Sequence, residues 1–168
     1  WGCRGSYPVC NKDILHFGGN TTCTEVEVGG HRIILDAGTG IINLGTKIMK
    51  EYFESGRTPD TRRPIVLNML FTHMHHDHNQ GFPFFKPLYL GSTILYVFGP
   101  KFFDKDMGDV LGNAMLPPFF PVELDELSAA KAIRNIMDTE VILLGGDYRV
   151  PVVKNIWRDQ IEHDERLV

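Results

Sequence analysis

Two adjoining stretches decide the fold: Pro64–Phe71 reads PIVLNMLF, and Thr72–His78 follows at once and reads THMHHDH. The first stretch is almost continuously apolar, which is typical of a strand covered on both faces. The second holds four of the seven histidines, all within six residues. Because open α/β sheets place their ligand sites at the carboxyl ends of strands, the sequence predicts a functional site at this strand end.

Strands and helices alternate around this stretch. Apolar residues from Ile41 to Phe53 recur at helical spacing, and Gly56 follows them, which predicts a helix. Thr93–Phe98 is a second apolar run and predicts another strand. The pattern indicates the mixed α/β class. The remaining expected elements are a hairpin of Thr22–Val28 and His31–Asp36 around Gly29-Gly30, a short proline-interrupted helix over Asn79–Leu90, a second hairpin of Glu140–Leu144 and Tyr148–Val153 around Gly145-Gly146 with Pro151 on an edge strand, and a helical or frayed tail from Asp159 to Arg166.

Length and composition predict a single folded domain over residues 1–168, with 43% hydrophobic and 23% charged residues. The formal net charge of −4 disfavours nucleic-acid binding through bulk positive charge, although it allows a local basic channel. No apolar run approaches the roughly 20 residues of a membrane span. With no signal peptide in the sequence either, a cytoplasmic, non-membrane protein is expected. Three cysteines without a CxxC pair argue against a disulfide framework and against a thiolate zinc site.

The spacing of the histidines predicts a metal centre. In an extended chain the side chains of His73, His75 and Asp77 point the same way, and a helix beginning after Asp77 would bring His78 toward them, with His76 pointing elsewhere. Imidazole and carboxylate are ligands that Zn²⁺, Mn²⁺ and iron accept. We therefore expect two adjacent ions, with His73 and His75 on one and Asp77 and His78 on the other, holding a bridging hydroxide.

Asp36 ends the strand before Gly38 and has two candidate roles. Its carboxylate could hydrogen-bond a metal-bound histidine and fix the orientation of that ring. It could also cap the turn or helix that follows. The sequence favours the two roles equally, since one carboxylate can serve both.

Aromatic residues are frequent after the histidine segment. They could stack on a nucleobase, but packing in the core or in an interface is the more common use of such side chains. An exposed aromatic surface would favour a homodimer. The residues concerned are Phe82, Phe84, Phe85, Phe102, Phe103, Phe119 and Phe120.

The segment His73–His78 resembles the HxHxDH signature of the metallo-β-lactamase superfamily. Four further segments are similar to the branch of ribonuclease Z and the phosphodiesterase-like hydrolases, and the resemblance covers roughly residues 1–153. It implies an αββα sandwich with the metals at one edge between the sheets. The four segments are Gly2–Ser6, Gly18–Cys23, Ile34–Gly40 and Pro121–Leu127.

The resemblance also implies a reaction and its residues. His73 and His75 would bind the first metal, and Asp77 and His78 the second, with Zn²⁺ or Mn²⁺ as the two cofactors. Asp77 would be the catalytic residue that orients the attacking water or hydroxide. The implied substrates are phosphodiesters or nucleotides, such as tRNA 3′ ends and cyclic nucleotides, hydrolysed through a metal-bound hydroxide. A thioester or lactam hydrolase of the same superfamily would use the same metal residues.

The sequence departs from this family after about residue 153. The family supplies two further histidines and a bridging aspartate, but only His163 follows His78, and Ile156 stands where a histidine is usual. One interpretation is that the chain covers only the N-terminal portion of the sandwich. The alternative is a variant with a degraded site, which would be a non-catalytic metal-binding or interaction domain. His163-Asp164 could be an improvised ligand pair, although polar surface residues are more common in such a segment.

Overall fold

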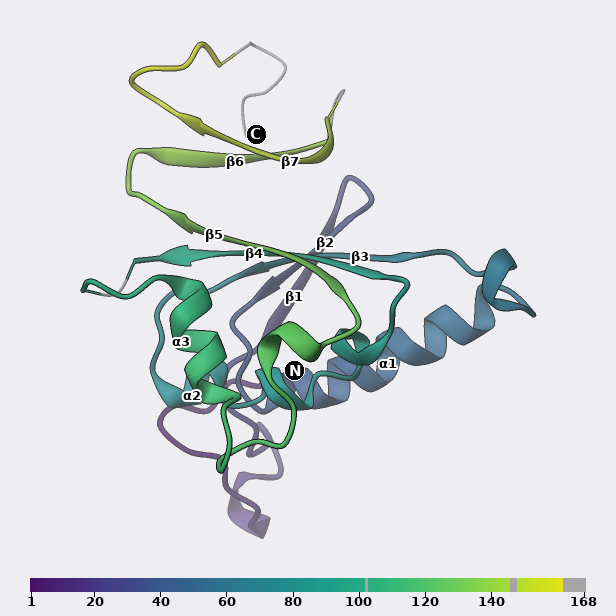
Figure 1. Ribbon diagram of the computed structural model, residues 1–168. Helices are drawn as coiled ribbons and strands as arrows, with labels where there is room; N and C mark the ends of the chain where they lie inside the picture. The colour runs from purple at the N-terminus through teal and green to yellow at the C-terminus, as the bar shows by residue number, and fades with distance from the viewer. Residues whose placement is uncertain (102, 146–147, 162–168) are drawn as a thin grey trace.

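The structure, a computed structural model, describes residues 1–101, 103–145 and 148–161. It contains a five-stranded sheet, a separate two-stranded sheet and three α-helices in this part of the chain (Figure 1). The expected His163-Asp164 pair, most of the expected tail, Gly146 and Phe102 lie outside the described residues. The strands are β1 (Thr24–Val28), β2 (His31–Leu35), β3 (Ile65–Leu70), β4 (Thr93–Pro100), β5 (Ala130–Ile136), β6 (Glu140–Gly145) and β7 (Tyr148–Asn155), and the helices are α1 (Gly40–Glu54), α2 (His76–Asn79) and α3 (Met107–Ala114).

The larger sheet has the strand order β1-β2-β3-β4-β5 and is mostly parallel. Strands β2 to β5 run parallel to one another, and β1 pairs with β2 in antiparallel orientation. The β1–β2 hairpin turns at Gly29 and Gly30, whose φ values of 55° and 80° lie in the region that favours glycine. The predicted first hairpin, the predicted helix and the mixed α/β class are therefore confirmed.

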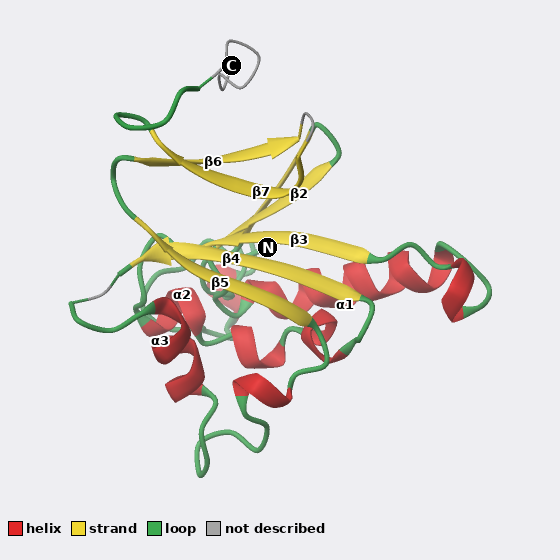
Figure 2. Cartoon of the chain, turned by 45° about the horizontal axis from the view of Figure 1, so that its top comes forward, coloured by secondary structure: helices red, strands yellow, loops and turns green. Residues whose placement is uncertain are grey.

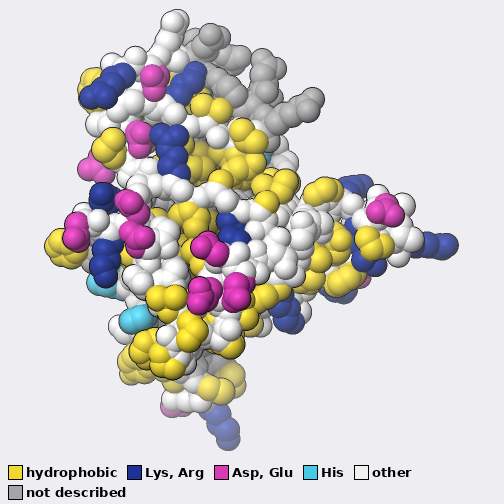
Figure 3. Space-filling view, in the orientation of Figure 1, with side chains coloured by type: hydrophobic (Ala, Val, Ile, Leu, Met, Phe, Trp, Pro, Cys, Tyr) yellow, Lys and Arg dark blue, Asp and Glu magenta, His cyan; other side chains and the backbone are white. Residues whose placement is uncertain are grey.

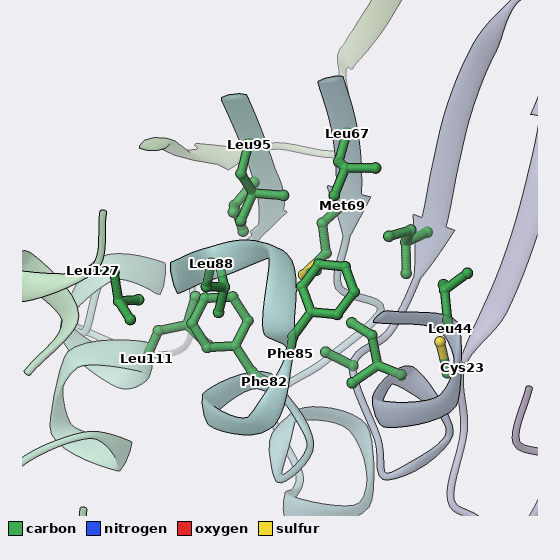
Figure 4. Close-up of a cluster of buried hydrophobic side chains, with 14 of the residues drawn as sticks. Cys23, Leu44, Leu67, Met69, Phe82, Phe85, Leu88, Leu95, Leu111 and Leu127 are labelled. Carbon is green, nitrogen blue, oxygen red and sulfur yellow. The ribbon is translucent and has the colours of Figure 1, made fainter. Parts of the chain in front are cut away.

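The helices all lie on one face of the large sheet, and the β6–β7 hairpin lies on the opposite face (Figures 1 and 2). The strand register explains the helical side, because it places Ile34, Leu67 and Leu95 toward the helices, where all three are fully buried. Figure 4 shows Leu67, Met69 and Leu95 above the rings of Phe82 and Phe85. The core thus forms between the sheet and the helical layer, and it fixes the ends of the strands.

The second face of the large sheet is apolar as well, but it is only partly covered. Val66 on β3 is 47% exposed and Ile94 on β4 is 38% exposed. The expectation that the Pro64–Phe71 strand is covered on both faces is therefore wrong at Val66, because the two strands β6 and β7 do not extend over the whole sheet. Asn68 on the same face is buried, and its side-chain oxygen has no hydrogen-bond partner among the described residues.

The predicted helix over Asn79–Leu90 is wrong. Helix α2 ends at Asn79, and two short 3-10 turns follow, Phe82–Phe84 and Lys86–Tyr89. Each turn carries a proline at its first or second position, where the missing N–H is tolerated but a continuous helix is not. Strand β5 and helix α3 were not anticipated.

The β6–β7 hairpin agrees with the predicted second hairpin, and Pro151 lies in a strand that has only one neighbour in its sheet. After β7 the chain makes a turn, and the described residues Asp159–Ile161 are not helical, so of the two forms expected for the tail, helical or frayed, the helix is not formed over these residues. None of the helices in the described part of the chain is both long enough and apolar enough to cross a membrane.

The thiol of Cys23 is buried beside β1, and burial raises its pKa from an ordinary 9.0 to about 12. At pH 8 the group therefore stays protonated and unreactive. We expect iodoacetamide to label the exposed Cys3 and Cys10 of the native protein at pH 8, and Cys23 only after unfolding. Peptide mass spectrometry measures this directly. Equal labelling rates for the three thiols would contradict it.

The same pKa difference makes folding depend on alkaline pH. The thiol of Cys23 holds its proton more tightly in the folded state than in the unfolded chain. Its contribution to stability is therefore complete below the unfolded-state pKa and declines as the pH rises from there toward about 12.

Candidate metal centre

The carboxyl ends of β2 and β3 form the edge on which the candidate site is built. Leu35 pairs with Leu70 in the parallel register, and the backbone N–H of Asp36 donates to Leu70 at 2.9 Å, which extends the pairing by one residue. Asp36 then turns with a φ of 62°, a conformation that aspartate tolerates better than most residues. Its side chain is buried and points to the loop that follows β3.

The histidine segment changes from extended to helical earlier than predicted. Helix α2 begins at His76, so Asp77 lies inside it and the expected extended alternation stops at His75. The turn is fixed by the N–H of His78, which donates to His75 at 2.9 Å, and by the Asn79 side chain, which donates to Met74 at 3.0 Å. The early turn still brings the expected side chains together.

The four candidate ligands meet as two pairs. His73 Nε2 lies 3.2 Å from His75 Nδ1, and His78 Nε2 lies 3.4 Å from Asp77 Oδ2. The pairs are adjacent, because the rings of His73 and His78 are 4.0 Å apart between centroids. His76 is exposed, in agreement with the expectation that it points elsewhere. Figure 3 shows histidine side chains at the surface on the side of α2 and α3.

The donor separations fit a metal ion at each pair. Two ligands at the usual zinc–nitrogen distance of about 2.0–2.1 Å, at the tetrahedral angle, lie about 3.3–3.4 Å apart. The two pairs, at 3.2 and 3.4 Å, are close to this separation, and each would supply two ligands of a four-coordinate ion. Within residues 1–101, 103–145 and 148–161, no three His, Cys, Asp or Glu side chains are arranged around one ion position. Each ion would therefore need further ligands besides its pair, and the described His, Cys, Asp and Glu side chains do not supply them.

The buried carboxylate of Asp36 is the centre of the hydrogen bonding behind the histidines. Its Oδ2 lies 2.9 Å from His78 Nδ1, and the backbone N–H of Thr72 donates to Oδ1 at 2.8 Å. Helix α1 has Thr39, not Asp36, at its N-cap position. Of the two roles considered for Asp36, contact with a histidine is the one for which the structure supplies the geometry. Capping of α1 is not observed.

Two residues of the site were missed by the sequence analysis as individual contributors, Thr72 and Ser6. The hydroxyl of Thr72 bonds Asp36 and lies 3.0 Å from His73 Nδ1. The backbone N–H of Ser6 donates to Asp77 Oδ2 at 2.8 Å and holds the pKa of that carboxyl below its ordinary value of 3.8. Thr72 directly precedes His73 in the sequence, so a hydrogen bond from this threonine to the site could have been anticipated. A backbone donor has no side-chain signature, although Ser6 belongs to a segment quoted for the resemblance.

Three segments that are separate in the sequence converge around the histidine loop. Gly2 and Arg4 form isolated bridges with Cys23 and Thr21, and these bridges carry the chain to Ser6. The N–H of Gly38 donates to Thr22 at 2.8 Å. The segments Gly2–Ser6, Gly18–Cys23 and Ile34–Gly40 therefore all pack next to the site.

The aromatic residues and Ile156, which the sequence also suggested as functional candidates, do not belong to the two histidine pairs. Phe82 and Phe85 are buried in the core, whereas Phe84, Phe103 and Phe119 are exposed. Ile156, where a further histidine ligand was considered, is 43% exposed.

A cavity of about 420 Å³ lies at the opposite end of β3 from the histidines. Its Arg32 is already paired with Glu25, Glu27 and Glu51. Because Arg32 already has carboxylate partners and the cavity is remote from the histidines, we place no site there.

Comparison of the chain with protein-family models gives no match, and comparison with curated proteins gives none either.

Proposed function

We propose that this protein is a metal-dependent hydrolase of phosphodiester bonds, with a metallo-β-lactamase-like arrangement of its layers. The observation that carries the proposal is the pairing of four donors at one strand end, His73 with His75 and Asp77 with His78, each pair at a separation that suits two ligands of one ion. The proposed cofactors are two divalent ions, Zn²⁺ or Mn²⁺. The proposed substrates are a nucleotide or a nucleic-acid 3′ end.

The layers support the fold part of this proposal. Helices cover one face of the large sheet, and the β6–β7 hairpin begins a second sheet over the other face (Figure 2). Apart from Asn68, the β3 and β4 side chains of that other face are mostly apolar, as expected of the inner face of a sandwich. In an αββα sandwich, further strands would cover residues such as Val66 and Ile94, which are partly exposed here.

The residues of the site have distinct tasks in this reaction. Divalent ions would supply Lewis acidity, which polarises a phosphoryl oxygen and lowers the pKa of water. Asp77 is ionised at neutral pH, since the ordinary carboxyl pKa of 3.8 is lowered further by the Ser6 N–H, so it can accept a hydrogen bond from the attacking water and orient it. Asp36 fixes the ring of His78 from behind through the 2.9 Å contact with Nδ1.

Metal analysis and a hydrolysis assay test the proposal. The purified chain, dialysed against chelator and reloaded with Zn²⁺ or Mn²⁺, is expected to retain metal and to hydrolyse bis(p-nitrophenyl) phosphate. Retained metal without hydrolysis of phosphodiesters, thioesters or lactams would favour the alternative of a non-catalytic metal-binding domain. A protein that retains neither ion would refute the proposed site. The homodimer expected from exposed aromatic residues stays a prediction, which sedimentation analysis can check.

A further inference from the structure

We infer that Thr72 is a positioning residue whose hydroxyl fixes the tautomer of His73 and thereby exposes the lone pair of His73 Nε2. This inference rests on the proposed function for its purpose, but its physical content concerns hydrogen bonds that exist without a metal. The buried carboxylate of Asp36 contacts His78 directly. Through the Thr72 hydroxyl it would also determine the protonated nitrogen of His73, which it does not touch.

The argument starts at Asp36, which as a carboxylate can only accept hydrogen bonds. Its two oxygens are approached by His78 Nδ1 at 2.9 Å, by the backbone N–H of Thr72 at 2.8 Å, and by the Thr72 hydroxyl at 2.9 and 3.1 Å. Each of these three groups must therefore donate. For His78 this requires a proton on Nδ1, and in the neutral ring the lone pair is then on Nε2, the atom that faces Asp77.

The second step follows from the single proton of a hydroxyl. Because Thr72 donates that proton to Asp36, its oxygen can only accept from the two imidazole nitrogens beside it, His73 Nδ1 at 3.0 Å and His78 Nδ1 at 3.5 Å. His73 Nδ1 must therefore carry a proton. In the neutral ring the lone pair of His73 is then on Nε2, the atom that lies 3.2 Å from His75 Nδ1.

The result is a matched pair of ligand atoms. His73 and His78 are both held as the Nδ1–H tautomer, one through the Thr72 hydroxyl and one by Asp36 itself. Their Nε2 lone pairs point away from the buried carboxylate of Asp36. The lone pair of His73 faces His75 Nδ1, and that of His78 faces Asp77 Oδ2. Partners that hydrogen-bond the second nitrogen of a metal-binding histidine set its tautomer and ring orientation, and their loss typically weakens metal binding about 10–100-fold.

Two substitutions at Thr72 separate the hydroxyl from the rest of the side chain. Thr72→Val keeps the branched shape and removes the hydroxyl, while Thr72→Ser keeps the hydroxyl and removes a methyl group. Thr72 is exposed, and its backbone N–H still donates to Asp36 in both variants, so the loop is expected to fold in both. A thermal unfolding curve of each variant checks this.

The direct measurement is the tautomer of His73 in the metal-free protein. Two-bond ¹H–¹⁵N spectra at alkaline pH, where imidazole is neutral, distinguish a proton on Nδ1 from a proton on Nε2, and the His73→Gln variant assigns the signals. The parent protein and Thr72→Ser should show the Nδ1–H form of His73, and Thr72→Val a mixture of the two forms. The Nδ1–H form of His78 should persist in all three. An unchanged Nδ1–H form of His73 in Thr72→Val would overturn the inference.

A second measurement separates this inference from the proposed function. Chelator competition with Zn²⁺ should show affinity about 10–100-fold lower in Thr72→Val than in the parent, with recovery in Thr72→Ser. If the parent binds no zinc, the proposed function fails while the tautomer spectra still decide the role of Thr72. If the parent binds zinc and Thr72→Val binds it equally well, the positioning role is refuted and the proposed function stands.

Discussion

His73→Ala is expected to abolish metal binding at the first ligand pair and to lower phosphodiester hydrolysis more than about 100-fold, since it removes a ligand where loss of a mere supporting hydrogen bond costs about 10–100-fold. His73 is one of the two candidate ligands of its pair, 3.2 Å from His75 Nδ1, so its loss would leave His75 as the single ligand of that pair. Metal content by mass spectrometry and initial rates on bis(p-nitrophenyl) phosphate measure the two effects.

The matched control is His76→Ala. His76 lies in the same segment and is also a histidine, but it is exposed and lies outside both ligand pairs. We expect its replacement to leave metal content and rate close to those of the parent. Equal losses in His73→Ala and His76→Ala would show that the assignment of ligands is wrong, because a general effect of removing an imidazole would then explain both results.

Gly38→Ala is expected to destabilise the protein by about 3 kcal/mol or more, the range of severe steric substitutions. A methyl group at this position would lie 2.3 Å from the carbonyl oxygen of Asp77 and 2.6 Å from that of Thr22, and also 2.5 Å from the Thr21 hydroxyl. The two carbonyls belong to the backbone and cannot move aside without displacing the histidine loop. Urea unfolding followed by circular dichroism gives the free energy of unfolding.

Gly108→Ala is the matched control for that substitution. Gly108 lies in helix α3, and an added methyl group there meets no atom of the described part of the chain within 4 Å. Because alanine is favoured over glycine in helices, this change should stabilise the protein by up to about 1 kcal/mol. If Gly38→Ala unfolded at the same urea concentration as Gly108→Ala, the close approach of the β2–α1 turn to the histidine loop would be contradicted.

The parts of the fold that could be predicted are those with strong local patterns. The continuous apolar run of β3, the helical spacing in α1 and the paired glycines between β1 and β2 each specify their element without help from distant residues. Strand β5 lacks such a pattern, because Lys131 and Arg134 interrupt it and its pairing with β4 determines its conformation. Helix α3 contains two glycines and is held by the burial of Met107 and Leu111, which only the folded core reveals.

In the candidate site, too, the features with a local sequence pattern could be predicted and the long-range contacts could not. Its candidate ligands are neighbours in the sequence, so their spacing alone predicted that these side chains lie close together. The supporting contacts join residues far apart: Thr72 and Asp36 are separated by 36 positions, and Ser6 and Asp77 by 71. Asp36 could be proposed because it ends a strand beside glycines. The contact of Ser6 with Asp77 could not be predicted, because Ser6 contributes only its backbone N–H, a group that nearly every residue has.

The bond from the Ser6 amide to Asp77 has a practical consequence for anyone who shortens or tags this polypeptide. Amino acids 2–6 are easily mistaken for a dispensable overhang, since most of them are exposed and they form no named strand. A clone that starts at the β1–β2 hairpin would retain every histidine of the cluster and still lose the amide that donates to Asp77 Oδ2 and lowers the pKa of that carboxyl. Such a clone would keep all four candidate ligands, but the carboxylate that we propose to orient water would have lost one of its hydrogen bonds.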